Sequence, residues 1–305
     1  MSRVANLPWY DFPELEAATD ALWSGVAARL RAAGLADVPE RLARDGDYLA
    51  QWRDPRLLLS QACGYDVLYD AQEFLRPVAV PRFRLADCPA GTYRSAIVVR
   101  AAGGARTLDD LRGGIAVVND RTSHSGTNAW RPCLAAQSRA GRFFREVKVS
   151  GDHVTSLEMV AGGAADAACV DVVVLELCAK FRPESLDGLR EIDRTPPAPA
   201  PPWVTSRATD PAIVAALAQA LAETLAAPEN EWIRAALLID GVLPCDETTY
   251  HPLRDFERTA LALDYFELPA PDRSPLGRHE NRVVRTDLDG CGTGGDAGRG
   301  TRLQA

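Results

Sequence analysis

The sequence lacks the cysteine patterns that hold zinc ions and disulfide frameworks. It has seven cysteines, an odd number, and no two of them form a C-x-x-C pair. This matches neither the ligand spacing of zinc cages nor the paired cysteines of small secreted domains. We therefore expect no metal and no other cofactor, and we expect most of the cysteines to be buried free thiols.

Excess positive charge and long apolar runs are also missing. The formal net charge is −8 at pH 7, whereas a protein that binds nucleic acid needs a basic face. The charge argues against nucleic acid but not against a small anion, which a few local donors can bind in an acidic protein. The longest apolar stretch, 159–179, is interrupted by Asp166, Asp171 and Glu176. We therefore expect no membrane insertion.

The first residues show no secretory signal. They read Met-Ser-Arg-Val-Ala-Asn-Leu-Pro-Trp-Tyr, without an apolar core of about 7–15 residues or a small-residue cleavage site. The residues by themselves therefore predict a cytosolic protein.

Short apolar strands alternate with amphipathic helices, which is typical of an α/β architecture. A chain of 305 residues accommodates two domains of about 100–150 residues each. The first strand is expected at Arg3–Leu7. We expect the helix that follows to begin at a D-x-x-E signal, Asp11 with Glu14, and to end at Gly34.

The same periodicities predict the other elements. Strands are expected at Leu57–Ser60, Pro77–Pro81, Arg94–Arg100, Ile115–Val118, Phe144–Val149, Ala167–Val170 and Leu189–Asp193. Helices are expected at Gly64–Ala71, Val154–Ala161, Val172–Phe181, Pro211–Ala227, Asn230–Ile239 and Leu253–Leu263.

Two changes in composition divide the chain. The proline-rich run Thr195–Trp203 predicts an extended connector, because proline fixes φ and has no amide donor. Residues 269–305 are rich in Gly, Arg, Asp and Pro, which predicts a disordered tail. The tail contains a G-x-G-x-x-G match at Gly290–Gly295. We do not interpret it as a dinucleotide site, because no strand pattern precedes it and no helix pattern follows it.

The most informative segment is Ser123-His124-Ser125-Gly126-Thr127-Asn128, which comes after the strand Ile115–Val118. We expect it to open a helix, whose N-terminal amides and partial positive charge favour anions. The two serine hydroxyls add donors, and Gly126 lets a ligand approach the backbone. The same residue types also cap helices that bind no ligand. The segment alone leaves both interpretations open.

Several segments together resemble the PhnD-like family, the solute-binding proteins of phosphate, phosphite and phosphonate ABC transporters. The resemblance rests on the serine-rich segment with the preceding Asn119-Asp120, on Ser150–His153 and on Gly162–Asp171, and it covers about residues 3–265. Three upstream segments fit the same register: Leu7–Tyr10, Ser60–Tyr65 and Tyr93–Arg100. It implies the type 2 periplasmic-binding-protein fold, a two-lobed α/β Venus flytrap with a ligand cleft between the lobes.

The resemblance also implies a division of the chain and a compartment. Lobe 1 would comprise residues 1–98 and 197–268, and lobe 2 residues 99–196, with crossings near 97–100 and 195–203. Exported members of the family carry a signal sequence, so the resemblance implies the periplasm. The residues by themselves predict the cytosol, so both cellular compartments remain as alternatives.

The family's site residues carry over to matching positions. The residues implied to bind the ligand are Ser123, His124, Ser125, Gly126, His153, Asp171, Tyr10 and Tyr65. Other interpretations stay open for several of them. His153 also fits a surface helix cap, Asp171 an N-cap, and the two tyrosines a core between the lobes. Arg94 fits either a cation in the cleft or an exposed strand edge.

We expect a protein that captures a small oxyanion (phosphate, phosphite or phosphonate) for ABC transport or sensing, with an ABC permease as candidate partner. A carboxylate at Asp171 would select a ligand that offers a donor back, such as a monoprotonated phosphate or an aminophosphonate. One alternative is an enzyme, since Ser125, His153 and Asp171 occur in a nucleophile–base–orienter order. No G-x-S-x-G elbow surrounds the serine, so we expect no enzyme. The other alternative is a cytosolic effector sensor.

Overall fold

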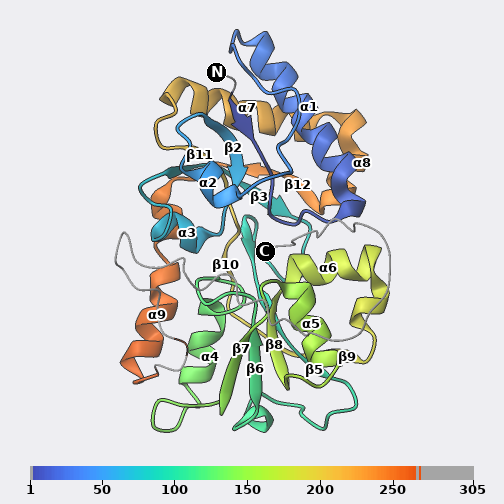
Figure 1. Ribbon diagram of the computed structural model, residues 1–305, viewed down its shortest axis with the longest axis vertical. Coiled ribbons are helices and arrows are strands. Elements are labelled where there is room, and N and C mark those ends of the chain that lie inside the picture. The colour runs from blue at the N-terminus through green and yellow to red at the C-terminus, as the bar shows by residue number, and fades with distance from the viewer. Residues whose placement is uncertain (1–2, 266–267, 269–305) are drawn as a thin grey trace, which may run out of the picture.

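Two five-stranded mixed sheets lie one above the other in the computed structural model (Figure 1). The structure describes residues 3–265 and residue 268. The predicted tail and its G-x-G-x-x-G match lie outside the described residues.

The first lobe, as we name it, is built on a sheet whose central strands are apolar. Its strand order is β1 (Val4–Ala5), β2 (Leu57–Gln61), β11 (Trp203–Ser206), β3 (Leu75–Phe83) and β12 (Ile239–Leu243). The helices of this lobe are α1 (Glu16–Ala32), α2 (Tyr48–Trp52), α3 (Gly64–Leu68), α7 (Pro211–Ala226) and α8 (Glu231–Leu237), with 3₁₀ turns at Pro13–Leu15 and Pro228–Asn230. The predicted apolar face of α1 is buried, which explains its long amphipathic pattern.

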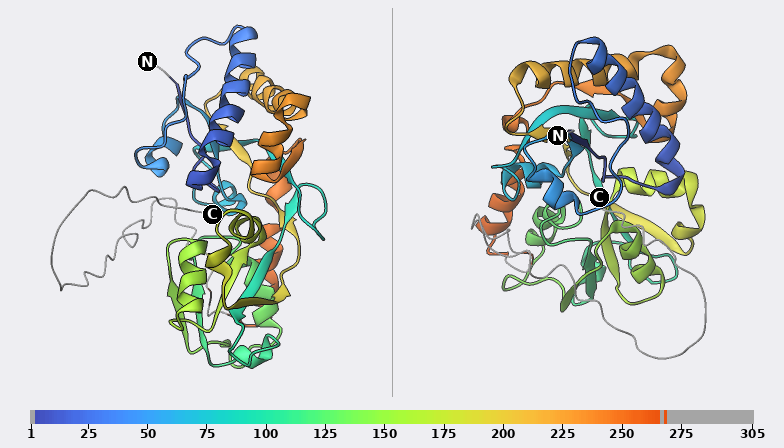
Figure 2. Two further views of the ribbon diagram at one scale, coloured as in Figure 1. Left: turned by 90° about the vertical axis from the view of Figure 1, so that its right-hand side faces the viewer. Right: turned by 45° about the horizontal axis from the view of Figure 1, so that its top comes forward.

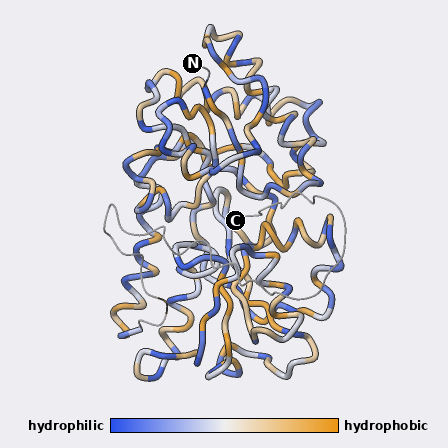
Figure 3. The backbone as a smooth tube through the Cα atoms, in the orientation of Figure 1, coloured by the Kyte–Doolittle hydropathy of each residue, from blue (hydrophilic) through white to orange (hydrophobic). Residues whose placement is uncertain are grey.

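The second lobe is built on the other sheet. Its strand order is β7 (Glu146–Val149), β6 (Ile115–Val118), β8 (Ala167–Asp171), β5 (Ser95–Arg100) and β9 (Leu189–Arg194). Its helices are α4 (Arg131–Ala135), α5 (His153–Ala161) and α6 (Val172–Phe181), with 3₁₀ turns at Asp109–Leu111, Asn128–Trp130 and Pro183–Leu186. Figure 3 shows the apolar residues concentrated along its central strands, where both faces of the sheet are covered.

A two-stranded ribbon joins the lobes. It pairs β4 (Thr92–Tyr93) with β10 (Ala198–Pro199) in antiparallel register. The proline-rich connector is therefore extended, as predicted. The first crossing lies before Ser95 and not at 97–100, because β5 is a central strand of the second sheet. Arg94 donates from Nη1 to the Thr195 carbonyl at 2.7 Å and from Nε to the Asp87 carbonyl at 3.0 Å, so it ties the crossings together.

The chain crosses between the lobes a third time after β12. A 3₁₀ turn at Glu247–Tyr250 leads into α9 (Leu253–Ala262), which packs against α4 (Figure 2). Ala260, Tyr265 and Leu268 belong to the same buried core as Trp130 of the second lobe. The division at residues 98 and 197 stays a prediction.

The predicted start of the helix that follows the first strand is wrong. Asp11 does not cap a helix, because its carboxylate pairs with Arg44 at 2.6 Å. The 3₁₀ turn that precedes α1 instead begins at Pro13, with no side-chain cap. The predicted helix Asn230–Ile239 ends early, at Leu237. Leu238 has left-handed backbone (φ 55°), and β12 then pairs with β3. The edge of the sheet satisfies the backbone groups of β12, and this tertiary pairing overrides the helical pattern.

No single helix in the described part of the chain is long and apolar enough to cross a membrane. Pro211–Ala226 and Pro228–Leu237 pass this test only as a pair, with a bend of 78° between them. The described cysteines are free, and Cys63, Cys169 and Cys178 are buried.

Candidate ligand-binding site

A hydrogen bond between Tyr10 and Asp171 joins the two lobes. Tyr10 lies in the turn after β1 with left-handed backbone (φ 56°), and its hydroxyl donates to Asp171 Oδ2 at 2.8 Å. Asp171 ends β8, and its Oδ1 accepts from the Val173 amide at 2.7 Å. Asp171 is thus the N-cap of α6 and also an inter-lobe contact. Burial raises the pKa of Asp171 to about 7, because a desolvated carboxylate favours its neutral form.

His153 faces the interior and is not a surface cap. Asp152 is the N-cap of α5, with its Oδ1 accepting from the Thr155 amide at 2.8 Å. His153 is 1% exposed, and its Nε2 lies 2.9 Å from Ser125 Oγ. Burial lowers the pKa of His153 to about 3, so the imidazole is neutral at physiological pH.

The serine-rich segment forms a turn and does not open a helix, contrary to the prediction. The 3₁₀ turn begins only at Asn128, and α4 begins at Arg131. The Gly126 amide donates to Ser123 Oγ at 3.2 Å, and the Asn128 amide donates to the Ser123 carbonyl at 3.1 Å. These amides are satisfied within the turn, so the argument from a helix N-terminus does not apply. The hydroxyl and imidazole groups of the segment are further candidate donors.

Gly126 is required by the packing of this turn against the end of β6. A Cβ atom at this position would lie 1.8 Å from Asn119 Oδ1 and 3.2 Å from the Asn119 backbone nitrogen. Close approach to protein therefore explains the glycine without a ligand. Its ligand contact stays a prediction.

His124 and Tyr65 form a second contact group. The His124 ring lies 6.3 Å from the Tyr65 ring, 6.0 Å from Tyr93 and 5.0 Å from Phe256, measured between centroids. The Tyr65 hydroxyl accepts from Arg131 Nη1 at 2.9 Å. Burial, and then the nearby Arg131 charge, lower the pKa of His124 to about 3.

The structure thus buries the predicted side chains in two adjoining groups. Gly126 is buried too, and each of the other predicted residues is at most 8% exposed: Ser123, His124, Ser125, His153, Asp171, Tyr10 and Tyr65.

Three residues beside the candidate site were not predicted from the sequence. Tyr93 lies on the crossing strand beside Ser125, and Asn128 and Arg131 surround His124. Tyr93 and Asn128 lie within motifs that carry the resemblance, which was the available signal for them. Arg131 had no such signal, because its partners Tyr65 and Glu257 are distant in sequence.

The sequence pattern of a family described as "ABC transporter, phosphonate, periplasmic substrate-binding protein" matches residues 56–250. The chain belongs to this family. Its members are binding proteins of transporters and not enzymes. No curated protein matches the chain.

Solved structures confirm the two-lobed type 2 periplasmic-binding-protein fold. PhnD1 from Prochlorococcus marinus in complex with methylphosphonate is 16% identical, with 84% of this chain and 97% of that chain covered and a TM-score of 0.69. PA3383 from Pseudomonas aeruginosa, a binding protein component of an ABC phosphonate transporter, is 18% identical, with coverages of 86% and 89% and a TM-score of 0.64. XAC2383 from Xanthomonas citri bound to ATP is 16% identical, with coverages of 86% and 98% and a TM-score of 0.63.

Proposed function

We propose that this protein captures a small phosphonate-like oxyanion (phosphonate, phosphite or phosphate) between its lobes, for ABC transport or sensing. The observation that carries the proposal is the buried Tyr10–Asp171 bond between the lobes. The hydroxyl and imidazole donors of the serine-rich turn and His153 lie in the same buried region, and the chain belongs to a phosphonate-binding family. The proposed ligand residues are Ser123, His124, Ser125, Gly126, His153, Asp171, Tyr10 and Tyr65.

The chemistry of the site narrows the ligand class within this proposal. Serine hydroxyls and neutral imidazoles donate hydrogen bonds to an oxyanion without adding positive charge. The Asp171 carboxylate repels a fully ionised ligand, but it accepts a hydrogen bond from a protonated oxygen or an amine of the ligand. We therefore favour a monoprotonated oxyanion or an aminophosphonate over sulfate.

A thermal-shift screen tests the proposal. The ligands are methylphosphonate, 2-aminoethylphosphonate, phosphite, phosphate and sulfate. A ligand at about 100 times its dissociation constant adds about 2.7 kcal/mol to the native state, which raises the melting temperature by several degrees. Calorimetry on the best ligands then gives dissociation constants. The proposal fails if none of the phosphorus oxyanions shifts the transition.

The hydrolase alternative is less well supported by the geometry. Ser125 and His153 are in contact, but Asp171 bonds to Tyr10 and to the Val173 amide. The other ring nitrogen of His153, Nδ1, is buried without a hydrogen-bond partner among the described residues. A serine triad needs a carboxylate at that nitrogen to orient the base. We expect no ester hydrolysis above that of a Ser125→Ala control.

The effector-sensor alternative uses the same ligand site, but the protein would then act on a soluble protein partner and not on a permease. Co-purification with a permease and its ATPase would support the transport role. Ligand-dependent binding to a soluble protein, without a permease, would support sensing.

A further inference from the structure

The side chain of Asn128 connects His124 to a buried arginine. Asn128 Oδ1 accepts from Arg131 Nη1 at 2.8 Å. Asn128 Nδ2 lies 3.0 Å from His124 Nδ1 and 3.0 Å from the Leu253 carbonyl oxygen. All three side chains of this relay, Arg131, Asn128 and His124, are at most 1% exposed.

This arrangement determines which nitrogen of His124 carries the proton. A guanidinium only donates, so the amide atom that faces Arg131 is the oxygen, and the other end of the amide is the NH₂ group. The NH₂ group also donates to the Leu253 carbonyl, which only accepts. His124 Nδ1 therefore accepts a hydrogen bond, and in a neutral imidazole the proton then lies on Nε2.

The surroundings also oppose a second proton on the ring. The imidazole is buried, and the Arg131 charge lies nearby; both lower the pKa of His124 to about 3. The Glu257 carboxylate pairs with Arg131 at 3.8 Å and accepts from the Tyr69 hydroxyl at 3.0 Å, so it offsets part of the Arg131 charge and burial is the larger cause. The titratable groups around the ring are Cys63 and Tyr65 at the start of α3, Tyr93 on β4, Arg131 on α4 and Glu257 on α9.

We propose that Arg131 and Asn128 are positioning residues that hold His124 as a neutral imidazole with its proton on Nε2, and that this N–H donates to the captured oxyanion. His124 Nε2 is buried without a hydrogen-bond partner among the described residues. A buried donor without a partner is costly, and a ligand oxygen would remove that cost. The identity of the acceptor rests on the proposed function, whereas the tautomer does not.

The tautomer is measured directly on the full-length wild-type chain. Protein with ¹⁵N-labelled histidine is examined by NMR from about pH 5 to about pH 8, with and without methylphosphonate, and His124→Gln assigns the signals. We expect a protonated Nε2 and an unprotonated Nδ1 throughout. A proton on Nδ1, or a cationic ring in this range, overturns the proposal.

A variant of the positioning residue tests the cause. Asn128→Asp places a carboxylate, which only accepts, opposite Nδ1, so the proton moves to Nδ1 and the pKa of His124 rises. At about pH 8 methylphosphonate binding should weaken roughly tenfold or more, and it should recover as the pH falls and both nitrogens become protonated. A change in affinity that does not depend on pH indicates a structural role only.

A matched pair of His124 variants tests the donor. Glutamine places an N–H near the position of Nε2, whereas asparagine reaches only the position of Nδ1. We expect His124→Asn to bind methylphosphonate roughly ten- to a hundredfold more weakly than His124→Gln. Equal weakening overturns the donor role while the proposed function stands. If no oxyanion binds the wild type, the proposed function and the donor role both fail, and the spectra still decide the tautomer.

Discussion

At the scale of single residues, Asp171 combines a structural role with the proposed role in ligand binding. Its carboxyl group accepts two buried hydrogen bonds, one from the Val173 amide as the N-cap of α6 and one from the Tyr10 hydroxyl. Burial raises its pKa from 3.8 to about 7. The unfolded chain releases the proton of Asp171 near pH 4, whereas the folded protein keeps it up to about pH 7.

This difference makes Asp171 a source of pH-dependent stability. Across that range the folded state holds more protons than the unfolded state, so the contribution of Asp171 to the unfolding free energy falls as pH rises. Asparagine at position 171 resembles the neutral carboxylic acid but does not titrate, so it removes this pH dependence of the unfolding free energy. We expect Asp171→Asn to gain on the order of 2–4 kcal/mol relative to wild type between about pH 4 and pH 8. Urea unfolding of both proteins at several pH values measures it, and a constant difference would contradict the raised pKa.

His153 should contribute to the binding of every oxyanion. It is buried, and its Nε2 contacts Ser125, so its loss removes a donor without affecting the charge balance at Asp171. A hydrogen bond to a charged group contributes about 1.5–3 kcal/mol, so we expect His153→Ala to weaken all ligands roughly ten- to a hundredfold. Calorimetry with methylphosphonate and phosphate measures the loss. Asp171→Asn is the control, because it should instead favour fully ionised ligands over those that bring a proton.

At the scale of elements, the turn at 123–127 is shaped by the contact between Gly126 and Asn119. We expect Gly126→Ala to cost about 1–3 kcal/mol of stability, because a Cβ would overlap the Asn119 side chain and press on its backbone. Gly104→Ala is a matched control, since a Cβ there meets no atom within 4 Å. Chemical denaturation of both variants measures the difference. Equal stabilities would mean that the turn relaxes and does not depend on this close approach.

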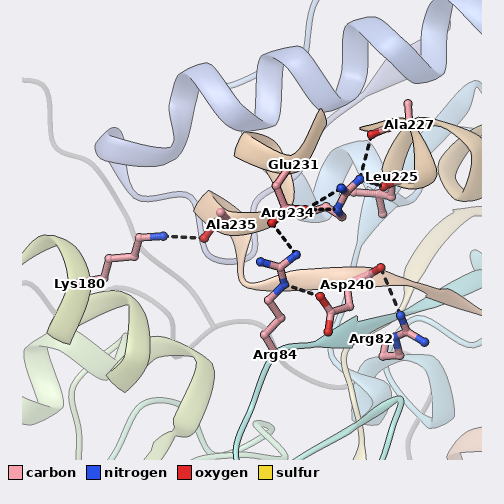
Figure 4. A network of polar contacts seen from close by, with 9 residues as sticks. All are labelled: Arg82, Arg84, Lys180, Leu225, Ala227, Glu231, Arg234, Ala235 and Asp240. Atoms are coloured by element: carbon pink, nitrogen blue, oxygen red, sulfur yellow. Dashed lines mark hydrogen bonds and ion pairs between the residues drawn. The ribbon is translucent and has the colours of Figure 1, made fainter. Parts of the chain in front are cut away.

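At the scale of the whole molecule, contacts between the lobes cover the candidate site. Its side chains are buried, so under the proposed function a ligand would enter only when the lobes separate. On the α6 side, Arg182 pairs with Glu14 of the first lobe at 2.8 and 2.9 Å and lies 4.8 Å from the Phe12 ring. Lys180 Nζ reaches across to the Ala235 carbonyl at 2.5 Å, beside the Arg84–Asp240 pair of the first lobe (Figure 4).

Breaking the Glu14–Arg182 pair should favour the open state. The side chains are 35% and 23% exposed, and pairs of this kind contribute about 0.2–1 kcal/mol. We therefore expect Glu14→Arg to raise the dissociation constant for methylphosphonate about 1.4- to fivefold, mainly through faster dissociation. The exchanged pair, Glu14→Arg with Arg182→Glu, should recover affinity. Stopped-flow kinetics measures both, and small-angle scattering follows closure. No recovery in the exchanged pair would show that the ion pair does not stabilise closure.

Apolar periodicity in the sequence predicted most of the α/β framework. Ile115–Val118 and Val172–Phe181 are β6 and α6 with the predicted bounds, because apolar periodicity reports which face of an element is buried. The proline run predicted the extended return between the lobes, since proline restricts its own backbone. Family motifs pointed to the residues of the candidate site.

Which of these residues are in contact depends on the packing of distant segments. Tyr10 and Asp171 are 161 positions apart, and no local pattern encodes their contact. Arg131 gave no sequence signal, because Tyr65 and Glu257, which help to position it, come from two distant segments. The helix predicted to open at the serine-rich segment became a turn, and Ile239 joined a sheet edge. In each case contacts with residues distant in the chain outweighed local preference, because backbone and polar groups buried on folding must find partners wherever the fold supplies them.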